Sequence, residues 1–329
     1  MKAMHSLKMK CNYGYSALRP AVFLMAVLMA AACSKEPAEV PAPGEAVRVN
    51  FVVSGIEQTT EATKAGEALA EGTTVRIAAY YHDPGNPQAS TLCKEVTYCV
   101  RDGKLVPCTV DGNGNFIAFG GQDMELLSYA YDFYAVSPAL PLSTDKRLVS
   151  KVPHGVDYAT SVTANQNIST SKVQTVSLTT LRRRCAKVDF VVNRADNFST
   201  LTAINVKKLT VGGLRQTCTN VGINSSVPAG AGSTSYVLPG EAFTASGATT
   251  ASASAFLLPI SGAGNITFDY ELECTINGTT VNETINGSIA NLKLDPAKHY
   301  TVTMTVKENV AGLTVVAWNV NTYTTDIGG

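Results

Sequence analysis

The sequence lacks an excess of charge of either sign. It contains 26 lysines and arginines and 26 aspartates and glutamates, so its formal net charge is zero. A protein that binds nucleic acid needs a basic surface to neutralise phosphates, and this composition argues against such a partner. The one dense basic run, at residues 182–184 with Lys187 close behind, is typical of a solvated strand edge or turn.

Recognisable catalytic, cofactor and metal motifs are also missing. The sequence has no CxxC or His-paired spacing for zinc, no GxSxG around a serine nucleophile and no phosphate-binding glycine loop that opens a helix. The run DGNGN at residues 111–115 begins like a calcium loop, but Phe116 and Gln122 occupy the positions that require Gly and Glu. A turn between strands is the favoured interpretation. We therefore expect no catalytic residue, no metal and no cofactor.

Long hydrophobic runs are absent except for one near the start. Residues 21–32 are apolar, follow a region with four basic residues, and form a run too short to span a bilayer. This pattern predicts a signal peptide over residues 1–32. Three alanines directly precede Cys33 and resemble a bacterial lipoprotein cleavage box, in which this cysteine is acylated. Ordinary cleavage near Ala32 is the alternative.

The segment after Cys33 differs from the rest of the chain. Residues 34–46 (SKEPAEVPAPGEA) are rich in proline, alanine and glutamate, which favour extended backbone and cannot bury a core. We predict a tether over residues 33–46. Removal of residues 1–32 would leave a mildly acidic chain with a formal charge of −4, because that segment holds four basic and no acidic residues.

Helical periodicity is scarce beyond the tether, and the fold is predicted to be all-β. Short β-branched and aromatic runs alternate with Gly, Pro, Asn and Asp, as in residues 47–53 (VRVNFVV). Three dipeptides predict tight hairpin turns, namely Asp102–Gly103, Asn277–Gly278 and Asn286–Gly287.

Chain length and turn spacing favour two β-sandwiches over a barrel or propeller. A weaker stretch rich in Gly, Ser and Ala, at residues 219–254, is typical of loops and marks a domain boundary. We predict an N-terminal domain over residues 47–217 and a C-terminal domain over residues 218–329.

Eight cysteines are present, of which Cys11 lies in the predicted signal peptide and Cys33 directly follows it. Across a two-residue Asp102–Gly103 turn, Cys99 and Cys108 would be diagonal neighbours, usually too far apart to bridge, whereas a four-residue loop would place them opposite. Because an exported protein meets oxidising conditions, the two thiols remain a candidate disulfide. Buried free thiols are the favoured interpretation for most cysteines.

Several segments between Cys33 and the end of the chain resemble the fimbrillin family of Bacteroidales bacteria, the Mfa-like fimbrial proteins. The resemblance rests on the lipoprotein signal and on short hydrophobic patterns. These are VRVNFVVSGIEQTTEATKAGE, GTTVRIAAYY, YDFYAVSP, DYATS, LRRRCAKVDFVV, LKLDPAKHYTVTMTVK and a near-terminal AWN.

The resemblance implies two transthyretin-like Greek-key β-sandwich domains in a pilus subunit that reaches the outer membrane as a lipoprotein. It also implies that a protease specific for Arg or Lys cuts the loop after the first strand and removes lipid and strand together. A strand of a neighbouring subunit, commonly its C-terminal segment, then fills the vacated groove.

Residues of this sequence can be matched to that scheme. Lys64, followed by Ala65, is the one basic residue between residues 54 and 73, although an ordinary exposed lysine is the alternative. The residues of the displaced strand and its groove would be Val47, Val49, Phe51 and Val53. Candidate donor residues in the last strand are Leu313, Val315 and Ala317, although this strand could equally close its own domain.

The sequence therefore predicts a non-enzymatic fimbrial subunit, assembled by strand exchange and contributing to surface adhesion. Its partners would be other fimbrial subunits, in a homo- or hetero-polymer, the outer membrane through the N-terminal lipid, and a host or glycan ligand. The alternative is a surface lipoprotein that keeps its anchor and binds glycans or host proteins. A fimbrial anchor or tip subunit would be intermediate between these two functions.

Overall fold

The computed structural model describes six stretches of the chain. They are residues 46–56, 68–85, 91–169, 172–230, 232–309 and 312–326, and beyond residue 307 the backbone alone is described. The predicted signal peptide, most of the tether, and the residues Cys33, Lys64 and Ala65 lie outside these stretches.

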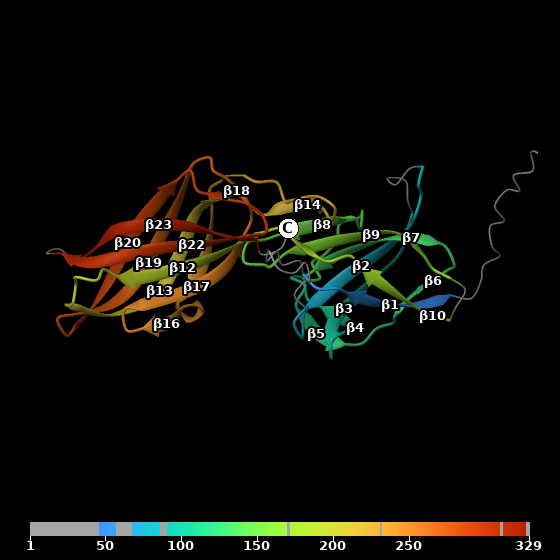
Figure 1. Ribbon diagram of the computed structural model, residues 1–329, viewed down its shortest axis with the longest axis horizontal. Helices are drawn as coiled ribbons and strands as arrows, with labels where there is room; N and C mark the ends of the chain where they lie inside the picture. Colours follow the sequence, from blue (N-terminus) through green and yellow to red (C-terminus); the bar gives the residue numbers. More distant parts are fainter. Residues whose placement is uncertain are drawn as a thin grey trace, which may run out of the picture. The chain divides into compact units, whose positions relative to one another are not determined.

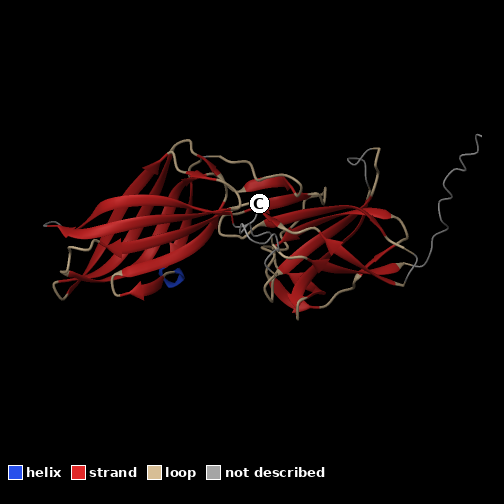
Figure 2. Cartoon of the chain, viewed as in Figure 1, coloured by secondary structure: helices blue, strands red, loops and turns tan. Residues whose placement is uncertain are grey.

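The described chain is built almost entirely of β-strands, which confirms the all-β prediction (Figure 2). One 3-10 turn, η2 (Gly240–Ala242), is its helical element among the described residues. Most strands alternate buried and exposed side chains, as in β12, where Ala186, Val188, Phe190 and Val192 are all buried. This period of two is what a sheet with one face on a core requires.

Two sheets from the first part of the chain enclose one hydrophobic core. The seven-stranded sheet has the order β11-β9-β7-β2-β3-β4-β5 and the three-stranded sheet the order β10-β1-β6. Their strands are β1 (Val47–Val53), β2 (Thr74–Tyr81), β3 (Leu92–Arg101), β4 (Lys104–Val110), β5 (Phe116–Phe119), β6 (Met124–Leu126), β7 (Ala130–Ser137), β9 (Ala159–Asn167), β10 (Val173–Leu178) and β11 (Arg182–Arg183). Side chains from both sheets, including Phe51, Ile77, Phe133 and Leu178, form this core.

The other face of the seven-stranded sheet is covered as well. A second buried cluster joins Tyr80, Val136 and Tyr158 to the two-stranded sheet of β8 (Leu148–Val152) and β14 (Cys218–Gly222). As a result, β7 is buried on both faces, and seven of its eight residues are buried. The central strands of this sheet are therefore held from two sides.

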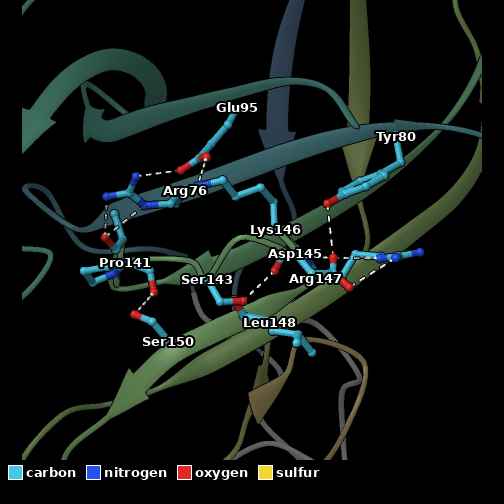
Figure 3. Close-up of polar contacts among 11 residues, drawn as sticks. Arg76, Tyr80, Glu95, Pro141, Ser143, Asp145, Lys146, Arg147, Leu148 and Ser150 are labelled. Atoms are coloured by element: carbon cyan, nitrogen blue, oxygen red, sulfur yellow. Dashed lines mark hydrogen bonds and ion pairs between the residues drawn. The ribbon is translucent and has the colours of Figure 1, made fainter. Parts of the chain in front are cut away.

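A polar network fastens residues 139–150 to this covered face (Figure 3). The Arg76 guanidinium lies 2.7 Å from the Glu95 carboxylate and donates to the carbonyl of Ala139. Tyr80 donates to Asp145 at 3.2 Å, and burial followed by the nearby Asp145 charge raises the pKa of Tyr80 to about 12. Hydrogen bonds from Arg147 lower the pKa of Asp145. Since these groups are half-buried, their charges are less screened than those of exposed surface pairs.

Two further sheets are formed by the later part of the chain (Figure 1). They enclose a third hydrophobic cluster. The five-stranded sheet has the order β16-β17-β12-β22-β23, and the four-stranded sheet the order β15-β13-β19-β20. Their strands are β12 (Ala186–Arg194), β13 (Leu201–Leu214), β15 (Thr234–Pro239), β16 (Thr244–Gly247), β17 (Thr250–Leu257), β19 (Asn265–Ile276), β20 (Thr279–Ala290), β22 (Lys298–Asn309) and β23 (Gly312–Asp326). The short strands β18 (Ile260–Ser261) and β21 (Lys293–Leu294) pair separately.

Two of the three predicted hairpin turns are confirmed. Asp102–Gly103 and Asn277–Gly278 join paired strands, and all four residues have φ between 49° and 76°. The prediction at Asn286–Gly287 is wrong, because these residues lie inside β20 opposite Asp269 and Phe268. Sheet pairing along the whole of β19 outweighs the local turn preference.

The sheets do not divide at the predicted boundary between residues 217 and 218. Strands β12 and β13 precede residue 217 but pair with β17, β22 and β19, whereas β14 follows it and pairs back with β8. The stretch 219–254, expected to be loops, contains four strands, β14 to β17. These pairings join distant segments, whereas composition reports local preference alone.

His154 links three segments in the covering layer. Its Nε2 donates to the carbonyl of Arg215 at 3.0 Å, and its Nδ1 accepts from the backbone N–H of Leu258 at 3.2 Å. Burial lowers the pKa of His154, and the bond that Nδ1 accepts needs the neutral ring, because a protonated ring donates from both nitrogens. The folded state therefore disfavours the protonated form.

We predict that His154 makes the protein acid-sensitive. Its folded-state pKa lies below its unfolded value of about 6.5, so the unfolded chain takes up this proton first as pH falls. The free energy of unfolding should then decrease below about pH 6.5 until the folded-state pKa is reached. Urea unfolding at several pH values should show a smaller decrease for His154→Gln, and equal decreases would contradict the assignment.

Candidate functional site

Strand β1 holds the three-stranded sheet together. It pairs in parallel with β10 from Arg48↔Val173 to Val53↔Leu178, and antiparallel with β6 from Val47↔Leu126 to Val49↔Met124. In this sheet β10 and β6 are both neighbours of β1 and not of each other. Loss of β1 would therefore leave two strands without a partner in their own sheet.

One face of β1 fills the core beneath it. Val47, Val49 and Phe51 are 1%, 0% and 4% exposed, as the alternation in the sequence predicts, and Val53 is half-buried. The Phe51 ring makes edge contacts with Tyr98 and Phe133 at centroid distances of 5.6 and 5.2 Å. The strand thus presents a row of apolar side chains to a fitted groove.

The floor of this groove is rigidly built. Tyr98 in β3 accepts a hydrogen bond from the Met124 backbone N–H at 3.2 Å, and this fixes β6 beside β1. Burial raises the pKa of Tyr98, so its hydroxyl stays neutral. Burying each large apolar side chain contributes roughly 1.5–3 kcal/mol, and the three on β1 together contribute roughly 5–9 kcal/mol. That sum is comparable to the whole stability of a typical domain.

The opposite face of β1 is open to solvent. Val52 is 52% exposed, and Arg48 makes one partly exposed ion pair with Asp123 at 3.5 Å. Surface pairs of this kind contribute little. After β1, Ile56 forms a bridge with Leu181, and the chain then enters residues 57–67, outside the described stretches, where Lys64 and Ala65 lie.

The structure pairs the candidate donor strand within its own chain. β23 lies at the edge of the five-stranded sheet and pairs antiparallel with β22, with Val315 opposite Val306, Ala317 opposite Thr305 and Leu313 opposite Glu308. The register shifts between Thr305 and Val306. Within the single chain, β23 therefore closes the edge of the five-stranded sheet.

Cys99 and Cys108, the candidate disulfide pair, are free and buried in the structure. The two-residue turn at Asp102–Gly103 places Cys99 opposite Val106, which leaves the two cysteines diagonal. Burial raises the pKa of the Cys108 thiol to about 11 and also raises that of Cys99. Cys185, Cys218 and Cys274 are free and buried too, as expected.

The DGNGN run forms the expected turn between β4 and β5. Asp111 accepts hydrogen bonds from the backbone N–H groups of Asn113 and Asn115 at 2.8 Å, and hydrogen bonding from Asn115 lowers its pKa. In the part of the chain that the structure describes, no group of three or more His, Cys, Asp or Glu residues is arranged to hold a metal ion.

A protein-family model described as fimbrillin-like matches residues 42–327, nearly all of the chain beyond the predicted signal. The chain belongs to the fimbrillin-like family. This family consists of fimbrial and adhesion proteins of the cell surface, with a structural and not an enzymatic role. No curated protein matches the chain.

Solved structures with the same fold come from Bacteroides species. A "putative cell adhesion protein" from Bacteroides fragilis NCTC 9343 is 21% identical, with a TM-score of 0.65 over 86% of this chain and 100% of that one. Another from Bacteroides ovatus ATCC 8483 is 14% identical, with a TM-score of 0.53 over 85% and 97% of the two chains. At these identities the likeness shows the fold alone. Among the described residues, no helix is long and apolar enough to cross a bilayer.

Phe51 is predicted to be the strongest single contact between β1 and its groove. Phe51→Ala removes two ring contacts and leaves a cavity, which should lower the free energy of unfolding by about 3–5 kcal/mol. Val52→Ala, on the exposed face of the same strand, should change it by less than about 0.5 kcal/mol. Urea unfolding measures both, and equal effects would contradict the burial of this face.

Cys99 and Cys108 are predicted to be reduced but protected thiols. Because both are buried with raised pKa values, iodoacetamide at pH 8 should modify them slowly in the folded protein. In urea without a reductant both should react completely. Mass spectrometry of the alkylated protein measures this, and a pair that reacts only after reduction would show a disulfide.

Proposed function

We propose that the protein is a fimbrial subunit, exported as a lipoprotein and assembled by β-strand exchange at the groove of β1. One observation carries the proposal: β1 alone bridges β10 and β6, and it buries three apolar side chains between them. A sheet opened in this way presents unpaired backbone and an apolar groove, which favours capture of another strand.

The position of β1 in the chain suits its removal. It is the first described strand, and Lys64 lies eleven residues after its last residue, Val53. Cleavage after Lys64 would release the lipid-bearing Cys33, the tether and β1 as one piece. The new chain would begin at Ala65, ahead of β2.

The groove sets requirements for an incoming strand. It must run parallel to β10 and antiparallel to β6, and it must place apolar side chains at alternate positions over about seven residues, as β1 does. The last strand of a second copy, with Leu313, Val315 and Ala317, is a donor of suitable composition. β23 lies at a sheet edge and pairs with β22 alone. Its release would therefore break the backbone hydrogen bonds of one strand pair.

The remainder of the groove is built to persist without β1. The seven-stranded sheet keeps the β8–β14 layer and the network of Arg76, Glu95 and Asp145 on its other face. When loss of β1 exposes the inner face of the seven-stranded sheet, the packing on the other face of that sheet therefore stays in place. This supports the view that a cleaved subunit stays folded long enough to receive a strand.

A second candidate function is a surface lipoprotein that keeps its anchor and binds glycans. One observation favours it, namely an exposed aromatic pair on the edge strand β5. Phe116 and Phe119 are 38% and 41% exposed with ring centroids 4.6 Å apart, and Arg101 lies 4.8 Å from the Phe119 ring. Exposed rings of this kind can stack on sugars or other apolar surfaces. An anchor subunit would combine a retained N-terminus with such a surface. A tip subunit would combine an unfilled groove with such a surface.

Lys64→Ala is predicted to block maturation. Protein recovered from the native cell surface should begin at Ala65 without lipid, whereas the variant should keep acylated Cys33 and form no polymer. Lys104→Ala, an exposed lysine in β4, is a matched control and should mature normally. N-terminal sequencing and intact mass measure the outcome. A wild-type chain that begins at acylated Cys33 would instead support an anchor or a glycan-binding lipoprotein.

A further inference from the structure

Strand β5 carries a small exposed apolar patch at one end of the seven-stranded sheet. Among the side chains that the structure describes, seven large hydrophobic ones are exposed, and three of them lie in this four-residue strand. Phe116 is 38%, Ile117 61% and Phe119 41% exposed, and we call these three side chains the β5 patch. Clusters of exposed apolar side chains on a soluble domain commonly mark an interaction surface.

A β-bulge gathers the two aromatic rings of the β5 patch on one face. The register of the β4–β5 pair shifts between Thr109 and Val110, and Ile117 is the extra residue in β5. Phe116 and Phe119 therefore share a face, with ring centroids 4.6 Å apart. Because a short, bulged edge strand is a poor template for a further β-strand, a partner would contact the side chains of the patch and would not extend the sheet.

The β5 patch differs from a surface on which a sugar ring stacks. Such stacking uses a flat, accessible aromatic face. The planes of the two rings in the patch differ by 53°, and the guanidinium carbon of Arg101 lies 4.8 Å from the centre of the Phe119 ring, over one of its faces. The most exposed member of the patch, Ile117, is aliphatic. An apolar protein surface therefore suits the patch better than a carbohydrate does.

Opposite charges flank the β5 patch at its two ends. Arg101 lies at the Phe119 end, and its ion pair with Asp102, at 4.0 Å between exposed groups, contributes little. Asp111 lies at the other end, because its backbone N–H donates to the carbonyl of Asn115, the residue directly before β5. Hydrogen bonds from Asn115 lower the pKa of Asp111, so this exposed carboxylate is charged at neutral pH.

We propose that the β5 patch binds the β5 patch of a second copy of this chain about a two-fold axis. An axis that reverses the direction of β5 would bring the Phe119 end of one copy against the Phe116 end of the other. Arg101 of each copy would then face Asp111 of the other, so that one arrangement covers both apolar patches and pairs opposite charges. The contact needs neither exchange nor removal of β1 and is independent of the proposed assembly.

Sedimentation equilibrium of the unlipidated chain, residues 34–329, tests the proposal with β1 in place. Because the patch holds only three large side chains, the dimer should be weak, with a Kd of about 10–100 µM. Ile117→Lys would bury an unpaired charge in the contact and should raise the Kd at least about tenfold, with little change in thermal unfolding. Val237→Lys changes an exposed valine of edge strand β15, outside the patch, and should leave the Kd within about twofold.

Charge reversal tests the two-fold arrangement. Arg101→Glu would place carboxylates of the two copies together and should raise the Kd about tenfold, whereas Arg101→Gln, which only removes the charge, should raise it less. Lys293→Glu makes the same charge change at an exposed lysine of β21 and should leave the Kd within about twofold.

Three results would overturn the proposal. They are a monomer at every concentration up to about 500 µM, a dimer whose Kd is unchanged by Ile117→Lys, and equal Kd values for the wild type and Arg101→Glu. The second result would place the contact elsewhere, β23 included. A monomer that is retained on immobilised mucin glycans, with retention lost in Phe119→Ala, would assign the patch to sugars instead.

Discussion

The fit of β1 between β10 and β6 is the constraint on which the first sandwich depends. Val47, Val49 and Phe51 close the core from one side, and the same strand supplies the ladder partners of both neighbours. Because its buried side chains contribute roughly as much as a domain's whole stability, the position cannot stay empty. The proposed assembly follows from this requirement, since any strand of matching pattern and direction can satisfy it.

The layers around β1 make such an exchange physically reasonable. The seven-stranded sheet is packed on both faces, by β1 and its neighbours on one side and by β8 and β14 on the other. Polar contacts of Arg76 and Asp145 add to the second side. The cost of opening the groove is therefore confined to one sheet. Membership of the fimbrillin-like family agrees with a structural role at the cell surface.

The sequence predicted the strands better than their partners. Alternation over residues 47–53 identified the buried face correctly, because a strand with one buried face imposes that pattern locally. The turn at Asn286–Gly287 was wrong, and strand pairing crosses the predicted domain boundary, since pairing of β19 with β20 and of β12 with β22 is set by distant segments. The arginine run resembled a solvated edge, but Arg183 is half-buried and donates to Asp157, and no local pattern in the sequence reports the approach of that carboxylate.

Hydrogen exchange measured by mass spectrometry tests the central claim most directly. The amides of β10 and β6 should be compared in the full chain, in the chain cleaved after Lys64 with β1 removed, and in the assembled polymer. We expect strong protection in the full chain, loss of protection when β1 is removed, and recovery in the polymer without β1. Unchanged protection of β10 in the cleaved chain, or a polymer whose subunits all retain β1, would contradict this claim.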